Sequence, residues 1–70
     1  MRDWLKIART AKRLTMKTLG SRLGVSESYY CAIENGTRQL RMDMSLASKL
    51  SKELDIPLDI IAKHEGQNTV

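Results

Sequence analysis

The sequence predicts an all-α fold, a single small domain of five short helices, and three observations support this prediction. Apolar residues recur three or four positions apart, the spacing that places them on one face of a helix. Residue types that favour helix starts precede several of these stretches, and glycines follow two of them. No segment alternates apolar and polar residues as a half-buried strand does. At 70 residues the core is small, so the stability should be modest.

The first helix is expected over about residues 3–13, with Asp3 as its N-cap. Its apolar stripe consists of Trp4, Ala8 and Ala11, with Leu5 beside them. A fourth helix is expected over about 43–54, and Pro57 fits the first turn of a short fifth helix. The inward residues of these two helices are expected to be Leu46, Ala47, Leu50, Leu54, Leu58 and Ile61.

The second and third helices should be joined by a very short turn. Thr15 can cap the second helix, and Gly24 ends it. Ser26 can then cap the third helix, which ends at Asn35-Gly36. Two short helices joined this tightly must cross steeply, which is the geometry of a helix-turn-helix. Gly20, in the second helix, fits a crossing point at which no larger side chain has room.

The C-terminal end of the chain is predicted to hold a dimer contact. The five helices account for a domain over residues 1–64, and residues 65–70 are expected to form a frayed tail. Ile60 lies about 100° from Ile61 around the fifth helix, so it should be exposed. An exposed isoleucine in a small basic domain is best explained as a contact with a second copy.

The net charge of +4 is unevenly distributed along the chain. Residues 1–22 contain seven basic residues and one acidic residue, a net charge of +6. Residues 23–42 are neutral, and residues 43–70 have a net charge of −2, with three basic and five acidic residues. This division indicates one side that faces a polyanion and another that is turned away from it, although solvated helix faces would give the same pattern.

The sequence offers no site for catalysis or for a metal. Cys31 is the only cysteine and His64 the only histidine, which excludes an internal disulfide, a Cys-based zinc site and a histidine cluster. No nucleophile–base set or phosphate-binding glycine loop is present, so we expect neither an enzyme nor a cofactor. Basic residues interrupt the N-terminal apolar runs, and no stretch approaches the ~20 apolar residues of a membrane span. We therefore expect a cytoplasmic protein with no membrane partner.

The residues around the expected turn resemble those of the Cro/CI-type (XRE, phage-repressor-like) helix-turn-helix family. The similar positions are Leu14, Thr15, Leu19, Gly20, Leu23, Gly24, Val25 and Ser26, followed by Tyr29, Tyr30, Ile33, Glu34, Asn35, Gly36 and Arg38. The resemblance extends over about residues 2–63. It implies a compact lambda-repressor-like domain of five helices that binds double-stranded DNA as a homodimer on a two-fold symmetric operator.

The resemblance also implies which residues contact DNA. The third helix would enter the major groove, and the positions that match its base-contacting face are Ser26, Glu27, Ser28 and Ala32. The alternatives are that Ser26 is only a cap and that Glu27 only complements the helix dipole. The phosphate-contact candidates are Lys17, Tyr29, Asn35, Arg38 and Arg41, with solvated charge as the alternative for the cations. Asn35 is also a candidate cap of the third helix. Finally, the family resemblance implies that Arg9 lies beside Glu34, which predicts a structural ion pair.

Three functions fit these observations. The first is a sequence-specific DNA-binding transcriptional regulator, a repressor of a phage, mobile element or bacterial operon that acts on nucleoid DNA. The second is an antitoxin, which adds a toxin as protein partner, and the third is an adaptor that binds protein without DNA. The intact DNA-contacting pattern and the basic N-terminal part favour the first.

Overall fold

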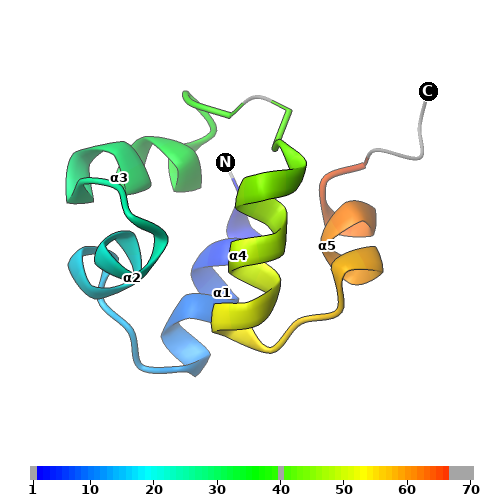
Figure 1. The fold of residues 1–70 in the computed structure, drawn as a ribbon, viewed down its shortest axis with the longest axis horizontal. Helices are drawn as coiled ribbons and strands as arrows, with labels where there is room; N and C mark the ends of the chain where they lie inside the picture. The colour runs from blue at the N-terminus through cyan, green and yellow to red at the C-terminus, as the bar shows by residue number, and fades with distance from the viewer. Residues whose placement is uncertain (1, 40, 67–70) are drawn as a thin grey trace.

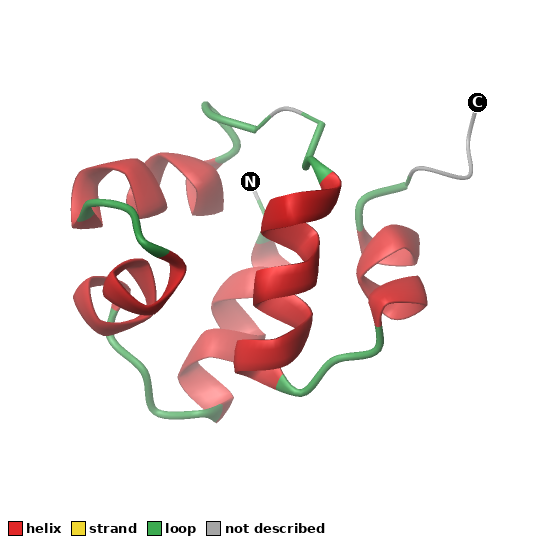
Figure 2. Cartoon of the chain, in the orientation of Figure 1, coloured by secondary structure: helices red, strands yellow, loops and turns green. Residues whose placement is uncertain are grey.

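The computed structural model describes residues 2–39 and 41–66 of the chain. These residues form five helices: α1 (Asp3–Ala11), α2 (Met16–Leu23), α3 (Glu27–Asn35), α4 (Met44–Leu54) and α5 (Leu58–His64) (Figures 1 and 2). Across the described residues there is no strand, and the all-α prediction is confirmed. No helix among them is long and apolar enough to span a membrane.

The helices are arranged so that α2 and α3 lie at one end of the molecule and α5 at the other (Figure 1). Between these ends, α4 packs against both α2 and α5, and α1 packs against α3. A buried set of large side chains from all five helices fills the centre: Leu5, Leu19, Tyr30, Ile33, Leu50 and Ile61. The helix-turn-helix end is therefore built on the same core that holds α5 in place.

Three helices begin with a side-chain cap. Thr15, Ser26 and Asp43 each precede a helix in extended conformation and accept a hydrogen bond from the backbone N–H three residues later, at 2.7–3.0 Å. This satisfies one of the otherwise unpaired donors of each first turn. The expected start of α1 is wrong, because Arg2 occupies the cap position and Asp3 is the first helical residue.

The expected end and inner face of α1 also need correction. The helix ends at Ala11 rather than at residue 13, where Arg13 adopts a left-handed conformation with φ of 57°. Ala11 is exposed, and the residues buried on α1 are Leu5 and Arg9. An apolar stripe cannot predict this face, because a charged side chain occupies part of it and is buried only through its partners.

The first two residues of the expected tail, Glu65 and Gly66, are bonded to the rest of the domain. Glu65 follows α5 directly, and its carboxylate accepts hydrogen bonds from Arg2 and Trp4. The backbone N–H of Gly66 donates to the carbonyl of Lys63 at 3.1 Å. These two residues are therefore held by the domain, and the rest of the expected tail, 67–70, lies outside the described residues.

The crossing of α2 and α3 occurs at Gly20, as the sequence predicted. A Cβ atom at Gly20 would lie 3.3 Å from the carbonyl oxygens of Val25 and Ser26 and from the Cβ of Tyr30. Two of these neighbours are backbone atoms, which cannot easily move to make room for a side chain. Gly24 has a different role, because its φ of 80° turns the chain out of α2 while the space around it is open.

We expect a bulky side chain at Gly20 to destabilise the domain by pushing α3 away from α2. Gly20→Val should lower the free energy of unfolding by about 1–3 kcal/mol, whereas Gly20→Ala should change it little, because a gain in helix propensity offsets the tight contact. Urea denaturation measures both variants. Ser21→Val, at the exposed neighbouring position, is the control for helix propensity. Equal stability of the two valine variants would contradict the close approach.

Candidate nucleic-acid interface

The turn between α2 and α3 is only three residues long and is fixed by backbone hydrogen bonds. The N–H groups of Gly24 and Val25 donate to the carbonyls of Ser21 and Gly20 at 3.1 and 2.9 Å. Ser26 then caps α3 through its side chain. Because both sides of the turn are bonded in this way, α3 is held at one angle to α2, which is the geometry expected of a helix-turn-helix.

The first residues of α3 face solvent. Ser26, Glu27 and Ser28 are exposed, and Ala32, one turn further along, is half-buried. Tyr30, on the opposite side of the same helix, is fully buried. The oxygen of Ser26 accepts the capping bond, so its proton can still be donated to another group. The four predicted base-contacting positions therefore lie on the accessible part of α3.

The predicted phosphate-contact residues lie on α2, on α3 and in the segment after α3. Lys17 is exposed in the first turn of α2, while Asn35, Arg38 and Arg41 are exposed at the end of α3 and beyond it. Tyr29 is half-buried. Asn35 is not the cap of α3: it is the last helical residue, its amide donates to the sulfur of Cys31 at 3.5 Å, and Gly36 occupies the cap position.

The loop that carries Arg38 and Arg41 is tied down by Gln39, which the sequence did not single out. The amide nitrogen of Gln39 donates to the hydroxyl oxygen of Tyr29 at 3.2 Å, and its amide oxygen accepts from the backbone N–H of Asp43. The hydroxyl proton of Tyr29 is therefore free to be donated elsewhere. This one side chain connects α3 to the start of α4.

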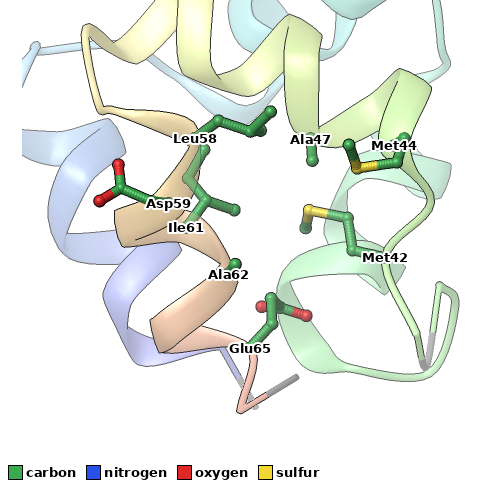
Figure 3. A pocket seen from close by; sticks show the side chains of 8 residues that line it. All are labelled: Met42, Met44, Ala47, Leu58, Asp59, Ile61, Ala62 and Glu65. Carbon is green, nitrogen blue, oxygen red and sulfur yellow. The ribbon is translucent and has the colours of Figure 1, made fainter. Parts of the chain in front are cut away.

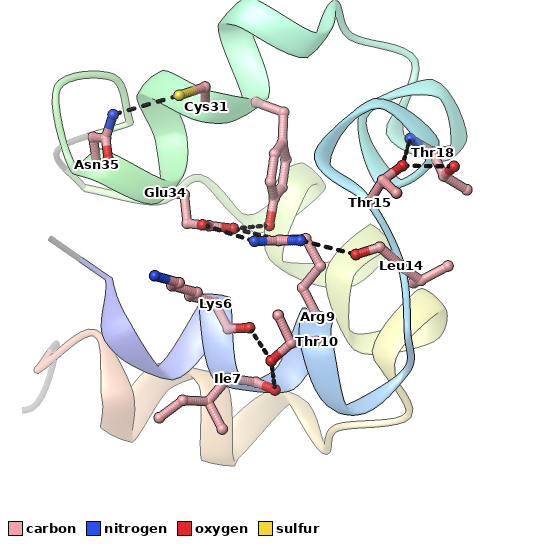
Figure 4. A network of polar contacts seen from close by, with 11 residues as sticks. Lys6, Ile7, Arg9, Thr10, Leu14, Thr15, Thr18, Cys31, Glu34 and Asn35 are labelled. Carbon is pink, nitrogen blue, oxygen red and sulfur yellow. Dashed lines mark hydrogen bonds and ion pairs between the residues drawn. The ribbon is translucent and has the colours of Figure 1, made fainter.

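Arg9 and Glu34 form the ion pair that the family alignment predicted (Figure 4). Nε and Nη2 of Arg9 donate to the two carboxylate oxygens of Glu34 at 2.9 and 3.3 Å, and Nη1 donates to the carbonyl of Leu14 at 2.8 Å. The hydroxyl of Tyr30 donates to the same carboxylate at 2.7 Å. Glu34 is only 1% exposed, so these bonds replace the water that its charge has lost.

Two pKa values reflect this network. Burial raises the pKa of Tyr30, and the hydrogen bond to Glu34 raises it further. The hydrogen bond to Glu34 also raises the pKa of Arg9, against the effect of burial. Tyr30 therefore stays protonated and Arg9 stays charged around neutral pH, which keeps both as donors to the carboxylate.

The uneven charge of the sequence is partly neutralised by folding. The described residues contain four ion pairs, and every one takes its cation from residues 1–22: Arg2–Glu65, Arg9–Glu34, Lys12–Asp55 and Arg22–Glu53. Three of the acidic partners come from residues 43–70. The prediction of a basic side and an acidic side is therefore too simple. Lys17, Arg38 and Arg41 take part in none of these pairs.

The described residues contain no group of three or more His, Cys, Asp or Glu that could hold a metal ion. The model of a family described as helix-turn-helix (HTH_3) matches residues 5–61, from the first turn of α1 to α5. This match spans the crossing at Gly20, the turn and the start of α3. The chain belongs to the XRE-type helix-turn-helix family.

The chain is similar to a curated protein of Bacillus subtilis (strain 168), the uncharacterized HTH-type transcriptional regulator YqaE. It is 33% identical over 66 residues, which cover 94% of this chain and 55% of the relative. The chain thus spans about half the length of the relative that it matches. No solved structure matches the chain.

Besides Gln39, two buried or half-buried charged residues of this helix-turn-helix domain were not identified from the sequence, Arg2 and Glu65. Arg2 is 7% exposed, and its guanidinium donates to backbone carbonyls in α3 and beyond it, while Glu65 lies across from it at the end of α5. Neither residue lies on an apolar stripe or in the helix-turn-helix pattern. An arginine just before an amphipathic helix was the only signal, and it does not distinguish a buried arginine from a solvated one.

Removing Arg9 should strongly destabilise the domain, because it leaves the carboxylate of Glu34 buried with Tyr30 as its remaining side-chain donor. We expect Arg9→Ala to lower the free energy of unfolding by roughly 3–5 kcal/mol. Thermal and urea denaturation at pH 7 measure this loss. Arg9→Met with Glu34→Met should recover much of it, since no unpaired charge then remains. As a control, Lys12→Ala removes an exposed ion pair and should have little effect. An unchanged melting temperature in Arg9→Ala would contradict the role of the pair.

Proposed function

We propose that this helix-turn-helix protein binds double-stranded DNA with sequence specificity and regulates transcription, as a repressor rather than as an enzyme. The observation that supports this most is the exposed start of α3, held at a fixed angle by the buried crossing at Gly20. In helix-turn-helix proteins the start of the motif's second helix, which is α3 in this chain, lies in the major groove. A protein of this kind acts in the cytoplasm, on nucleoid DNA.

The contacts with DNA divide between bases and phosphates. Ser28 and Glu27 open α3 and meet base edges: a hydroxyl can bond several bases, and a carboxylate can accept from the amino group of cytosine. Ser26 lies beside them, and the methyl of Ala32 meets a thymine methyl. Three of the exposed cations outside the internal ion pairs, Lys17 and the two arginines beyond α3, contact phosphates. Tyr29 and Asn35 add neutral donors to the backbone.

Selection of bound sequences from random duplex DNA tests this function directly. A recovered palindrome supports specific binding by two copies, and its half-site spacing measures the distance between the two α3 helices. If no sequence is recovered and no duplex binds with a salt-dependent affinity, the proposal of DNA binding is refuted and an adaptor function is favoured. A toxin partner, as in an antitoxin, would instead be found by co-purification with DNA binding intact.

Base and phosphate contacts should respond differently to salt. Arg38→Ala should lower the slope of log K against log salt by about one unit and weaken all duplexes alike. Ser28→Ala should relax the preference at one base pair by about 1–3 kcal/mol and leave the slope nearly unchanged. Fluorescence anisotropy on specific and scrambled duplexes measures both quantities. Lys63→Ala, on α5 at the opposite end of the molecule, is the control for net charge. Loss of specificity in Arg38→Ala at constant slope would refute this division.

We propose that the homodimer forms through the face made by α4 and α5. A hollow of about 420 Å³ lies between these helices and is lined mainly by apolar side chains: Met42, Met44, Ala47, Leu58, Asp59, Ile61, Ala62 and Glu65 (Figure 3). Met44, at 69% exposed, is one of the two large hydrophobic residues that the described part of the chain leaves most open to solvent. A second copy bound symmetrically here would cover it.

The position of this face suits a two-fold operator. Because α3 lies at the end of the molecule away from α5, a symmetric contact at α4–α5 leaves both α3 helices free on the outer sides (Figure 1). They can then enter successive major grooves, roughly 34 Å apart. Ile60 was expected to be exposed, and that expectation is wrong: it is half-buried, since 100° around the helix from Ile61 is the border of the buried face. It does not line the hollow, and it remains a candidate dimer contact on α5.

A charge at Met44 should prevent dimer formation. We expect Met44→Glu to sediment as a monomer at concentrations where the natural chain is a dimer, and to lose the preference for a full operator over a half operator. Ile7→Glu is the matched control, because Ile7 is 67% exposed on α1 and does not line the hollow. It should remain dimeric. A natural chain that is monomeric at high concentration and binds half and full operators equally would rule the dimer out.

A further inference from the structure

A buried arginine outside the helix-turn-helix pattern holds the loop between α3 and α4. Nη1 of Arg2 donates to the carbonyl of Ile33, in α3, at 2.6 Å and to the carbonyl of Arg38 at 3.3 Å. Nη2 donates to the carbonyl of Gln39. The guanidinium therefore connects α3 to two consecutive residues of the loop, Arg38 and Gln39, through backbone atoms that no side-chain change in the loop would remove.

The opposite edge of this guanidinium is fixed by the end of α5. Nε of Arg2 donates to both carboxylate oxygens of Glu65, at 3.0 and 2.9 Å. The same carboxylate accepts a bond from the indole of Trp4 at 2.8 Å, and the indole stacks on His64 with ring centroids 5.2 Å apart. The backbone N–H of Arg2 also donates to the carbonyl of Glu34 at 2.8 Å. Arg2 thus has a single well-defined position in the fold.

The loop needs such support, because part of its backbone is intrinsically unfavourable. Gln39 has a φ of 54°, a left-handed conformation that residues other than glycine rarely adopt. Its carbonyl is one of those bound by Arg2, and its side chain is held by Tyr29 and Asp43. Arg38 precedes it directly, and Arg41 follows two residues later. Arg2 therefore holds the backbone of Arg38 and Gln39 directly, and Arg41 lies in the same loop.

We propose that Arg2 is a positioning residue for DNA binding: by holding the backbone of Arg38 and Gln39 it places the loop arginines, Arg38 and Arg41, so that they reach the phosphates on one side of α3. Arg2 is itself buried and bound to protein carbonyls, so it acts through the loop and not by touching DNA. The planar fork of a guanidinium can serve several carbonyls and a carboxylate at once, which the single ammonium group of lysine cannot do. This inference rests on the proposed function.

The charge-conserving variant Arg2→Lys tests the proposal on the whole chain. We expect its affinity for specific and scrambled duplexes to fall by on the order of tenfold, and the slope of log K against log salt to fall by up to about two units, one for each phosphate contact. The net charge is unchanged, so a smaller slope reports contacts that the loop has lost. In an Arg38→Ala, Arg41→Ala background, Arg2→Lys should have little further effect. A variant that binds more weakly at an unchanged slope, or effects that are additive with those of the loop arginines, would overturn the proposal.

A second measurement needs no DNA and separates this inference from the proposed function. Trypsin cleaves after arginine and lysine, so it reports the opening of the loop at Arg38 and Arg41. Relative to cleavage after Lys49 in α4, which reports global unfolding, cleavage in the loop should be faster in Arg2→Lys than in the natural chain. Glu65→Gln, which weakens the support of Arg2, should give a smaller increase. Equal loop cleavage in all three proteins would refute the positioning role. If no duplex binds the natural chain, the proposed function fails, and with it the part of the inference that concerns DNA.

Discussion

The buried carboxylate of Glu34 is the interaction on which the rest of the structure depends. Arg9 brings α1 to it, Tyr30 fixes its orientation within α3, and the third bond of Arg9, to Leu14, ties in the segment before α2. The backbone carbonyl of Glu34 accepts from Arg2 as well. A charge this deeply buried is costly unless each partner is in place, so the network holds α1, α3 and the segment before α2 together.

That arrangement determines what α3 can present. Its inner face is committed to the core and to the carboxylate, and its crossing with α2 is limited by the space at Gly20. The position of the exposed first turn of α3 is therefore fixed by buried contacts. The loop that follows is different: it is held by hydrogen bonds from Arg2 and Gln39 rather than by a core of its own. A helix fixed by packing and a loop fixed by polar bonds suit separate tasks, contact with bases and contact with phosphates.

Much of the fold could be predicted from the sequence, because helix periods, caps and terminal glycines are local signals. Thr15, Ser26 and Gly24 all have the roles that local chemistry assigns them. Two local signals failed, since Asp3 and Asn35 are helical residues and not caps. The other failures lie where distant residues decide the outcome. The inner face of α1 includes Arg9, and the C-terminal end is held by Arg2, two charged residues whose burial depends on partners far along the chain. Likewise, a linear count of charge could not show that four N-terminal cations would be used in internal ion pairs.

We propose that the start of α3, the start of α2 and the loop that carries Arg38 and Arg41 together form the surface that contacts DNA. Amide chemical-shift mapping by NMR, with a duplex recovered by selection, tests it most directly. We expect the largest chemical-shift changes at Lys17, Glu27, Ser28 and Arg38, with smaller changes along α5. Changes concentrated on α4 and α5, with the start of α3 unaffected, would contradict it.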